Sequence, residues 1–252
     1  MLNIAITGAA SGLGRVVAER FSIKGHRVFA CDASEDAIAE LDRSGTVALA
    51  TRVDVSDREQ IELWFKDIFA RTASLDVLVN NVGVAGPHAA VEEMELNDWH
   101  QTLDANLSSA LITTRLALPA MKRAMSGSII NVSTISVLTN PAHRAPYVVS
   151  KAALEALTLA VAREAGPFNI RCNAVRPGMM NNERLMRILR RVAAQSGRTV
   201  EEVEGDQLRY IWMKKKVEML EVSQLIEFLA SDAACSITGQ IISVDGGMSW
   251  EE

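Results

Sequence analysis

Two side chains, Tyr147 and Lys151, could together carry proton-transfer chemistry. They stand four positions apart, so on a helix they lie on one face. A free phenol ionises near pH 10, which is too high for a base at neutral pH. An ammonium about 5 Å away stabilises a phenolate by roughly 3 kcal/mol at an effective dielectric of 20. The pair therefore predicts a tyrosine that works as a general acid–base.

A glycine-rich segment near the N-terminus could bind phosphate. It reads Thr7-Gly8-Ala9-Ala10-Ser11-Gly12-Leu13-Gly14 and stands between an apolar run and an amphipathic stretch. Glycines let the backbone turn sharply and approach a pyrophosphate, and the N-terminus of the next helix supplies N–H donors. The residues expected to contact a dinucleotide here are Gly8, Ser11, Gly12, Leu13 and Gly14.

An acidic residue, Asp32, ends the second apolar run. It lies about 20 residues after the glycines, the spacing of a carboxylate that binds the adenosine ribose. A 2′-phosphate there would meet like charge, at about 4 kcal/mol for 4 Å and an effective dielectric of 20. No Lys or Arg stands in the glycine turn before Gly14 to offset this. Asp32 therefore predicts NAD rather than NADP; the alternative is that it only caps the next helix.

The hydropathy pattern indicates which elements position these residues. Short runs rich in Val and Ile alternate with amphipathic stretches, which is typical of parallel strands covered on both faces. The strand candidates are Asn3–Thr7, Arg27–Asp32, Val47–Val53, Asp76–Asn80, Ser128–Val132, Ile170–Val175 and Gln240–Val244. We expect an α/β protein: a three-layer, doubly wound Rossmann fold whose seven-stranded parallel sheet is flanked by helices on both faces.

The chain reads as a single dinucleotide-binding domain over residues 1–252, because no Pro/Gly/Ser linker or repeat divides it. Long helical candidates cover about 96–124 and 147–165. From Gly178 to Lys216 the sequence is highly charged and has no strand candidate. A connection of this length is usually functional, so we interpret about 178–216 as a substrate-loop insertion.

Composition limits the class of protein. Of the 252 residues, 48% are hydrophobic and 23% charged, which is typical of a globular domain with a substantial core. The net charge of −5 argues against general nucleic-acid binding. No apolar run approaches the ~20 residues of a membrane helix, and the N-terminus lacks the basic region of a signal peptide.

Cysteine usage points to a reducing compartment. Cys31, Cys172 and Cys235 stand far apart, with no CxxC pair and no histidine at metal-ligand spacing. We expect all three to be small core residues and expect no metal site. The sequence therefore predicts a cytoplasmic protein with a small-molecule substrate, and no nucleic-acid or membrane partner.

Further short motifs follow in a fixed order along the chain. They are Asp54-Val55, Asn80-Asn81-Val82-Gly83, Asn106, Tyr147-Val148-Val149-Ser150-Lys151, Arg176-Pro177-Gly178, Gly239-Gln240 and Val244-Asp245-Gly246-Gly247. Together with the glycine turn, this set resembles the short-chain dehydrogenase/reductase family over nearly the whole chain. The resemblance implies a metal-independent oxidoreductase that moves hydride between a nicotinamide and a secondary alcohol or ketone. It also implies a homotetramer, or at least a dimer, with contacts through the two long helices and the C-terminal strand.

The resemblance also implies roles for individual residues. Tyr147 exchanges a proton with the substrate oxygen, and Lys151 activates it and binds the nicotinamide ribose. Asn106 positions a water beside the lysine. Beyond the glycine turn and Asp32, the cofactor contacts implied are Asp54, Val55, Asn81, Gly83, Pro177, Gly178 and Met180.

At one catalytic position the sequence departs from the family pattern. The family places a serine after the fifth strand, and counting back from Tyr147 to that position gives Thr134. Threonine keeps the hydroxyl that would hydrogen-bond the substrate oxygen, while its methyl group stiffens χ1. We expect Thr134 to substitute for the serine; Ser133 or Ser136 would take the role if the loop is shifted.

Basic residues are concentrated on the substrate side. His143 and Arg144 stand in the loop before Tyr147, and the insertion carries Arg184, Arg187, Arg190, Arg191, Arg198, Arg209 and Lys214-Lys215-Lys216. One interpretation is a solvated helical face paired with Glu201, Glu202 and Glu204. The other is that one or two insertion arginines, or Arg144 and His143, bind an anionic group. Either way, the few aromatic residues favour a small polar or anionic substrate.

Two other function classes stay open on the sequence alone. One is a binding protein that senses NAD without turnover, which the threonine at position 134 would fit. The other is an epimerase or dehydratase that uses bound NAD, although such enzymes usually have a larger C-terminal substrate domain.

Overall fold

Seven parallel strands form one sheet, in the order β3-β2-β1-β4-β5-β6-β7. The computed structural model describes residues 1–249. The strands are β1 (Asn3–Thr7), β2 (Arg27–Asp32), β3 (Leu49–Arg52), β4 (Val77–Asn80), β5 (Gly127–Val132), β6 (Ile170–Pro177) and β7 (Ile241–Val244). All seven predicted strands are present. The largest differences are at β3, which is shorter than expected, and at β6, which continues to Pro177 because Arg176 and Pro177 still pair with β7.

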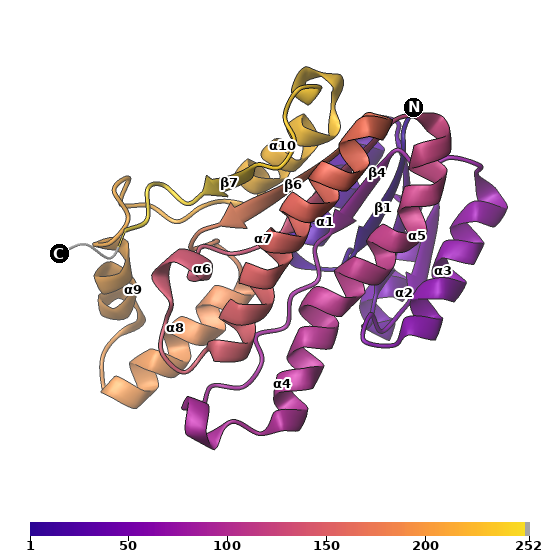
Figure 1. Cartoon of the computed structure of the whole chain (residues 1–252). Helices are drawn as coiled ribbons and strands as arrows, with labels where there is room; N and C mark the ends of the chain where they lie inside the picture. The colour runs from indigo at the N-terminus through magenta and orange to yellow at the C-terminus, as the bar shows by residue number, and fades with distance from the viewer. Residues whose placement is uncertain (250–252) are drawn as a thin grey trace.

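Helices cover both faces of the sheet (Figure 1). One face packs against α1 (Gly12–Ile23), α2 (Glu35–Arg43) and α10 (Met219–Ala230). The other packs against α3 (Arg58–Arg71), α5 (Ser109–Ala124) and α7 (Ala145–Ala165). The expected three-layer, doubly wound α/β fold is therefore confirmed.

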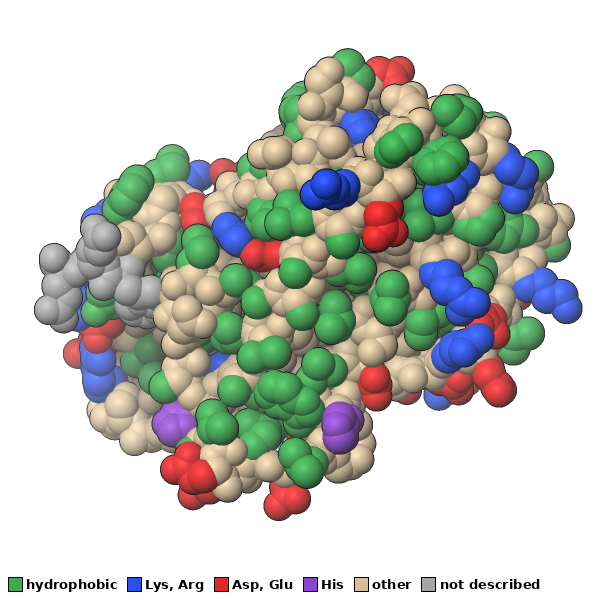
Figure 2. Space-filling model, in the orientation of Figure 1, with side chains coloured by type: hydrophobic (Ala, Val, Ile, Leu, Met, Phe, Trp, Pro, Cys, Tyr) green, Lys and Arg blue, Asp and Glu red, His purple; other side chains and the backbone are tan. Residues whose placement is uncertain are grey.

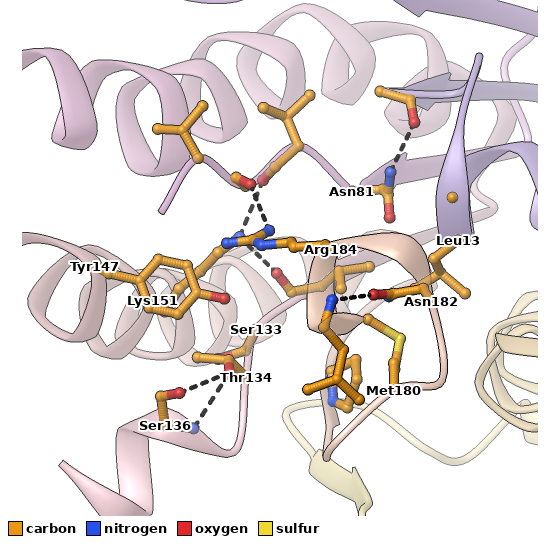
Figure 3. Close-up of a pocket in the computed structure, with 18 of the residues that line it drawn as sticks. Leu13, Asn81, Ser133, Thr134, Ser136, Tyr147, Lys151, Met180, Asn182 and Arg184 are labelled. Atoms are coloured by element: carbon orange, nitrogen blue, oxygen red, sulfur yellow. Dashed lines mark hydrogen bonds between the residues drawn. The ribbon is translucent and has the colours of Figure 1, made fainter. Parts of the chain in front are cut away.

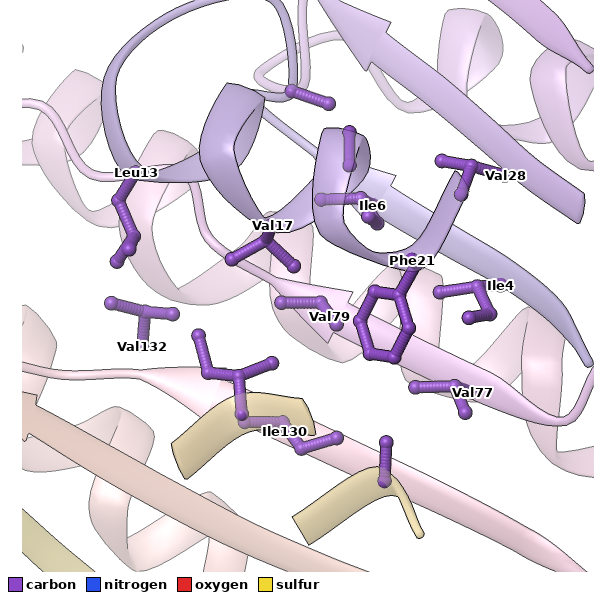
Figure 4. Packing of buried hydrophobic residues seen from close by; sticks show 14 of the residues in the cluster. Ile4, Ile6, Leu13, Val17, Phe21, Val28, Val77, Val79, Ile130 and Val132 are labelled. Carbon is purple, nitrogen blue, oxygen red and sulfur yellow. The ribbon is translucent and has the colours of Figure 1, made fainter. Parts of the chain in front are cut away.

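A hydrophobic core lies on each side of the sheet. On the first, Val17 and Phe21 of α1 pack over Ile4 and Val79 of the strands (Figure 4). On the second, Trp64 of α3 is 1% exposed and lies in the cluster with strand residues. Because β1 and β4 are covered on both faces, their central residues are apolar in succession and do not alternate with polar ones. This pattern predicts buried strands.

The long helical stretch predicted for about 96–124 is interrupted. It consists of α4 (Leu96–Leu103), a π-helical segment (Asp104–Ser108) and α5. Wide π turns inside a helix occur mostly at functional sites. Here the extra turn carries Asn106, whose buried side chain bonds the loop after β4.

The insertion folds as two helices, α8 (Glu183–Ser196) and α9 (Val200–Leu208), and as expected it contains no strand among the residues described. Leu189 and Ala193 of α8 pack with Val203 and Ile211 in a small core of their own. An isolated bridge between Ile211 and Met248 ties this unit to the segment after β7. In Figure 1 the two helices lie at one end of the sheet, beside α6 (Ser136–Thr139).

One helix is long and apolar enough for a membrane span by length and composition. It is Ala145–Phe168, which is α7 with the turn after it, and 44% of its most apolar window is buried. By length and composition, therefore, the expectation that no apolar run approaches a membrane helix is wrong. Core helices of folded domains pass the same test, and α7 packs against β6.

The cysteine expectation holds for two residues and fails for the third. Cys31 and Cys172 are buried free thiols in the sheet, whereas Cys235 is a free thiol on the surface. Cys235 follows a short 3-10 turn, Asp232–Ala234, and not a strand. A turn has no apolar periodicity, so the sequence around Cys235 does not indicate whether this thiol is buried or exposed.

Candidate active site

A cavity of about 690 Å³ lies where the strands end. Its volume is in the range of small-molecule and cofactor sites. The sequence-predicted residues that line it are Gly8, Ser11, Gly12, Leu13, Asp32, Asp54, Val55, Asn81, Gly83, Thr134, Tyr147, Lys151, Pro177, Gly178 and Met180. Gly14 and Asn106 do not line it. The carboxyl ends of parallel strands meet at one edge, so motifs that are far apart in sequence share this cavity.

The N-terminus of α1 opens toward the cavity without a side-chain cap. Ser11 occupies the N-cap position, its side chain bonds none of the first N–H groups, and the first turn has no acidic residue. By contrast, α2 and α3 are capped by Ser34 and Asp57. Uncapped N–H groups and a positive helix end provide what a pyrophosphate needs.

Gly14, which does not line the cavity, has a packing role. A Cβ placed there would lie 2.0 Å from the Gly8 carbonyl oxygen and 2.6 Å from Asn81 Nδ2. Asn81 in turn donates from Nδ2 to the carbonyls of Thr7 (3.1 Å) and Gly8 (2.9 Å). Thus Gly14 lets α1 approach β1 closely, while Asn81 holds the glycine turn to the loop after β4.

Asp32 lies beside the glycine turn, at the end of β2. One carboxylate oxygen accepts from the Ala10 N–H (3.1 Å) and the other from the Ser34 N–H (3.1 Å). These two bonds fix the carboxylate at the cavity wall and leave further lone pairs for ribose hydroxyls. Asp54 lines the same end of the cavity, and its carboxylate accepts from Ser56.

The opposite wall comes from the end of β6. The Gly178 N–H donates to the Val244 carbonyl (2.8 Å), and a Cβ at Gly178 would lie 2.6 Å from Asp245 Cα. Only glycine fits between these two chain segments. Met180 follows and forms a parallel bridge with Val217, which fixes the start of the insertion.

Tyr147 and Lys151 occupy one face of α7, as their spacing predicts. Tyr147 is 9% and Lys151 2% exposed. Lys151 Nζ donates to the Val82 carbonyl (3.0 Å) and to the Val132 carbonyl (2.7 Å). A Cβ at Gly83 would lie 3.3 Å from Lys151 Nζ, so glycine there makes room for the amine.

The buried position changes how Lys151 titrates. Burial, and secondarily the positive charge of Arg184, lowers the pKa of Lys151 to about 7. An amine that titrates near neutral pH can exchange protons under working conditions, which suits acid–base chemistry.

We expect Lys151 to make stability rise with pH. Between pH 7 and about 10.4 the unfolded chain holds a proton that the folded chain has released. The free energy of unfolding therefore increases through this window, by up to about 1.4 kcal/mol per pH unit. Denaturant titrations of the cofactor-free protein and of Lys151→Met at pH 7, 8 and 9 measure it. The wild-type protein should gain stability relative to the variant; parallel profiles would contradict the prediction.

The three candidate hydroxyls after β5 have different surroundings. Thr134 Oγ1 accepts from the Ser136 N–H (3.2 Å) and lies 3.3 Å from Ser136 Oγ. Ser133 donates to Glu155 Oε1 (2.6 Å), and Glu155 also forms a buried ion pair with Arg176. Figure 3 shows Thr134 and the Tyr147 hydroxyl bordering the same part of the cavity. The geometry favours Thr134, since the Ser133 hydroxyl is held by a carboxylate.

Asn106 is buried, and its side chain is engaged by protein groups. Its Oδ1 accepts from the Val84 N–H (2.8 Å), while Nδ2 donates to the Val84 carbonyl (3.0 Å) and to Ser150 Oγ (3.0 Å). The side chain therefore ties the loop after β4 to α7. Both side-chain N–H groups are already used, so Asn106 could hold a water only through an acceptor, either its own backbone carbonyl or the second lone pair of Oδ1.

Sequence reasoning missed two features of the site. The first is Glu155, noted only as an interruption of an apolar stretch; a lone acid on the buried face of a helix was the available signal. The second is the pair of cations on the tyrosine. The guanidinium of Arg144 lies 4.8 Å, and that of Arg184 5.6 Å, from the centroid of the Tyr147 ring.

The basic residues of the insertion separate into two groups. Arg190, Arg198 and Arg209 form exposed ion pairs with acidic side chains, and Lys216 pairs with Glu204. Glu201 and Glu202, named in the solvated-face interpretation, have no ion pair within residues 1–249. In the second group, Arg184 and Arg187 line the cavity, and together with Arg191 they also line a second cavity beside it. His143 stacks against His88, with 5.3 Å between ring centroids, and does not line either cavity.

Comparison with known proteins gives whole-length matches. A family model described as enoyl-(acyl carrier protein) reductase matches residues 8–249. A 3beta-hydroxysteroid dehydrogenase of Mediterraneibacter gnavus is 33% identical, over 97% of this chain and 93% of its own. A 3-oxoacyl-(acyl-carrier-protein) reductase of Thermotoga maritima is 32% identical, over 96% of each chain.

Solved structures share the fold at lower identity. Levodione reductase superposes with a TM-score of 0.90 at 24% identity, covering 98% of this chain and 96% of its own. NAD⁺-bound xylitol dehydrogenase gives 0.88 at 24%, covering 98% of each chain. An NADPH-dependent reductase involved in bacilysin biosynthesis gives 0.90 at 24%, covering 100% of this chain and 99% of its own. Because these neighbours differ in their nicotinamide, the fold alone does not select between the two cofactors.

Proposed function

The chain belongs to the short-chain dehydrogenase/reductase family of oxidoreductases, and from that premise we propose that it transfers hydride between NAD and a secondary alcohol or ketone. The observation that carries this proposal is the shared cavity. At one end it offers an uncapped helix terminus and a fixed carboxylate, and at the other a tyrosine and a buried lysine. A small polar substrate fits the second end, where hydroxyl and guanidinium groups lie.

The residues present fit a dinucleotide. The uncapped N–H groups of α1 would hold the pyrophosphate, and Asp32 the adenosine ribose. Asp54 and Val55 would lie at the adenine, and the segment from Pro177 to Met180 along the nicotinamide. When bound, the nicotinamide supplies or accepts the hydride.

The chain's own groups manage the proton and the substrate oxygen. In the direction of ketone reduction, the Tyr147 hydroxyl gives its proton to the carbonyl oxygen, which becomes the alcohol oxygen. Thr134 donates a hydrogen bond to that same oxygen as charge develops on it. The protonated Lys151 stabilises the phenolate that remains. Alcohol oxidation uses the same groups in reverse.

A substrate screen tests the proposed reaction. Hydroxy acids, sugar acids and polyols are each mixed with NAD⁺, and the absorbance of the reduced nicotinamide is followed. We expect turnover with members that carry a secondary alcohol. NADH binding without turnover, across this panel and the corresponding ketones, would instead support a dinucleotide sensor.

Asp32 is expected to set the preference for NAD. Replacing it with serine removes the like charge that a 2′-phosphate would meet, so the NAD-over-NADP ratio of kcat/KM should fall about tenfold or more. Asp36→Ser is a matched control, because Asp36 lies on α2, is exposed, and does not line the cavity. Initial rates with both cofactors measure the ratio. An unchanged ratio in Asp32→Ser would mean that another residue sets the preference.

Assembly and compartment complete the proposal. Hydrophobic side chains gather over α5 and α7 in Figure 2, and Leu111, Val149 and Leu159 are between 42% and 50% exposed. Apolar surface of this kind supports a homotetramer through these helices.

The free, exposed thiol of Cys235 fits a reducing compartment, so we place the protein in the cytoplasm.

A further inference from the structure

Four arginines from two separate elements gather at one cavity, and two of them contact the tyrosine ring. Arg144 is the N-cap residue of α7, and Arg184, Arg187 and Arg191 recur along one face of α8. All four line a second cavity of about 590 Å³ that adjoins the first. Arg144, Arg184 and Arg187 also line the first cavity, so they stand where the two cavities meet.

None of these four guanidinium groups forms an ion pair within residues 1–249. Neighbouring arginines of the insertion behave differently, since Arg190 pairs with Glu183 at 2.8 Å. Glu183 lines the first cavity, but its carboxylate is taken up by that external pair. Arg144 and Arg184 are half-buried, and Arg187 and Arg191 are exposed at the cavity rim. All four lack an acidic partner within residues 1–249, in a chain of net charge −5.

The contacts that the cluster does make leave its charge uncompensated. Arg184 Nη1 donates to the Gly83 carbonyl (3.0 Å), and Arg144 Nε is buried without a hydrogen-bond partner. Burial, opposed in part by Tyr147, lowers the pKa of Arg144, and the like charges of Arg184 and Arg191 lower it further. Converging cations of this kind are unfavourable in the free protein and become favourable when an anion lies between them.

The cluster lies next to the reacting group. Arg144 and Arg184 both contact the ring of Tyr147, at 4.8 and 5.6 Å from its centroid. Figure 3 shows the Arg184 guanidinium on the side of the cavity where Tyr147 and Lys151 lie. In a substrate with an anionic group bound by these arginines, that group is therefore only a few covalent bonds away from the oxygen that Tyr147 protonates.

We propose that Arg144, Arg184 and Arg187 form a carboxylate subsite, so that the substrate is a short hydroxy acid or oxo acid. The planar forks of two arginines match the two oxygens of a carboxylate. This inference rests on the proposed function, because it names the substrate class of the same site. The phosphates of the cofactor would bind elsewhere, at the uncapped N-terminus of α1.

The test separates carboxylate binding from cofactor binding and from turnover. Malonate is titrated calorimetrically into the NADH complexes of the wild-type protein and of the Arg184→Gln, Arg187→Gln and Arg209→Gln variants. Loss of a charge-assisted hydrogen bond should weaken malonate binding about tenfold or more in the first two variants. Arg209→Gln lies in the same insertion and should match the wild type, since Arg209 is exposed, lines neither cavity and pairs with Asp206, which keeps Arg198 as a partner. NADH affinity, read by fluorescence, should stay unchanged in all three.

Turnover gives a second readout. Short 2-oxo and 3-oxo acids are compared with their methyl esters, and the wild type should prefer each acid by tenfold or more in kcat/KM. Arg184→Gln and Arg187→Gln should lose this preference through a higher KM for the acid. Failure of malonate to bind the wild type, equal weakening in Arg209→Gln, or loss of NADH affinity in place of malonate affinity would overturn the subsite. Turnover of neutral ketones without acid preference would overturn the subsite alone. Absence of all turnover, with malonate bound as predicted, would overturn only the proposed reaction.

Discussion

Replacement of Tyr147 by phenylalanine is expected to lower turnover by about 10²- to 10⁴-fold while NADH still binds. The variant keeps the ring that packs against Arg144 and Arg184, and it removes only the hydroxyl that exchanges the proton. Initial-rate assays measure turnover, and the fluorescence of bound NADH measures cofactor affinity.

The chain offers a matched control for this change. Tyr210 is its only other tyrosine, and it lies outside both cavities. Tyr210→Phe should therefore turn over at the wild-type rate. Undiminished turnover in Tyr147→Phe would remove the proposed acid–base from the mechanism, whereas a joint loss of NADH binding would point to a structural effect.

The second large effect is expected at Thr134. Thr134→Val keeps the shape of the side chain and removes its hydroxyl, so the substrate oxygen loses one hydrogen-bond donor. Losing one such donor typically lowers kcat by 10²- to 10³-fold. Thr134→Ser restores the hydroxyl without the methyl group and should preserve or raise the rate. Steady-state kinetics on one substrate measure both variants.

Neighbouring hydroxyls provide the contrast for this prediction. Ser133 is held by Glu155, so Ser133→Ala should act mainly on stability and much less on kcat than Thr134→Val. Ser136 Oγ lies 3.3 Å from Thr134 Oγ1 and also lines the cavity, so it is the neighbouring hydroxyl placed to take over. An active Thr134→Val that becomes inactive when Ser136 is also changed to alanine would transfer the role to Ser136.

The sheet could be predicted from the sequence because its strands are buried on both faces. Asn3–Thr7 and Arg27–Asp32 were predicted with the observed bounds, since each has an unbroken apolar centre between two polar end residues. The break at Asp104–Ser108 could not be predicted in the same way. The π turn is accompanied by hydrogen bonds between Asn106 and Val84, which is 22 residues away, and local periodicity carries no trace of such a contact.

In the candidate site, too, features set by local spacing could be predicted, and features set by contacts between distant residues could not. The glycine turn, Asp32 and the Tyr147–Lys151 pair each depend on short spacings, so each could be recognised in the sequence. That they share one site was implied by the family resemblance, and the fold brings them to one cavity. The role of Glu155 depends on Ser133 and Arg176, which lie on other elements and more than 20 residues away. Likewise, the spacing of the insertion arginines indicated a helix face, but only the packing of α8 over the cavity shows which of them contact Tyr147.

Direct detection of hydride transfer tests the central claim. The protein is incubated with NAD⁺ and a secondary alcohol that is deuterated at its carbinol carbon, and the reduced nicotinamide is examined by mass spectrometry. The proposed chemistry predicts that the deuterium moves to the nicotinamide ring as the ketone forms, and that Tyr147→Phe nearly abolishes this transfer. Ketone formation with the label released to water, or label transfer undiminished in Tyr147→Phe, would contradict it.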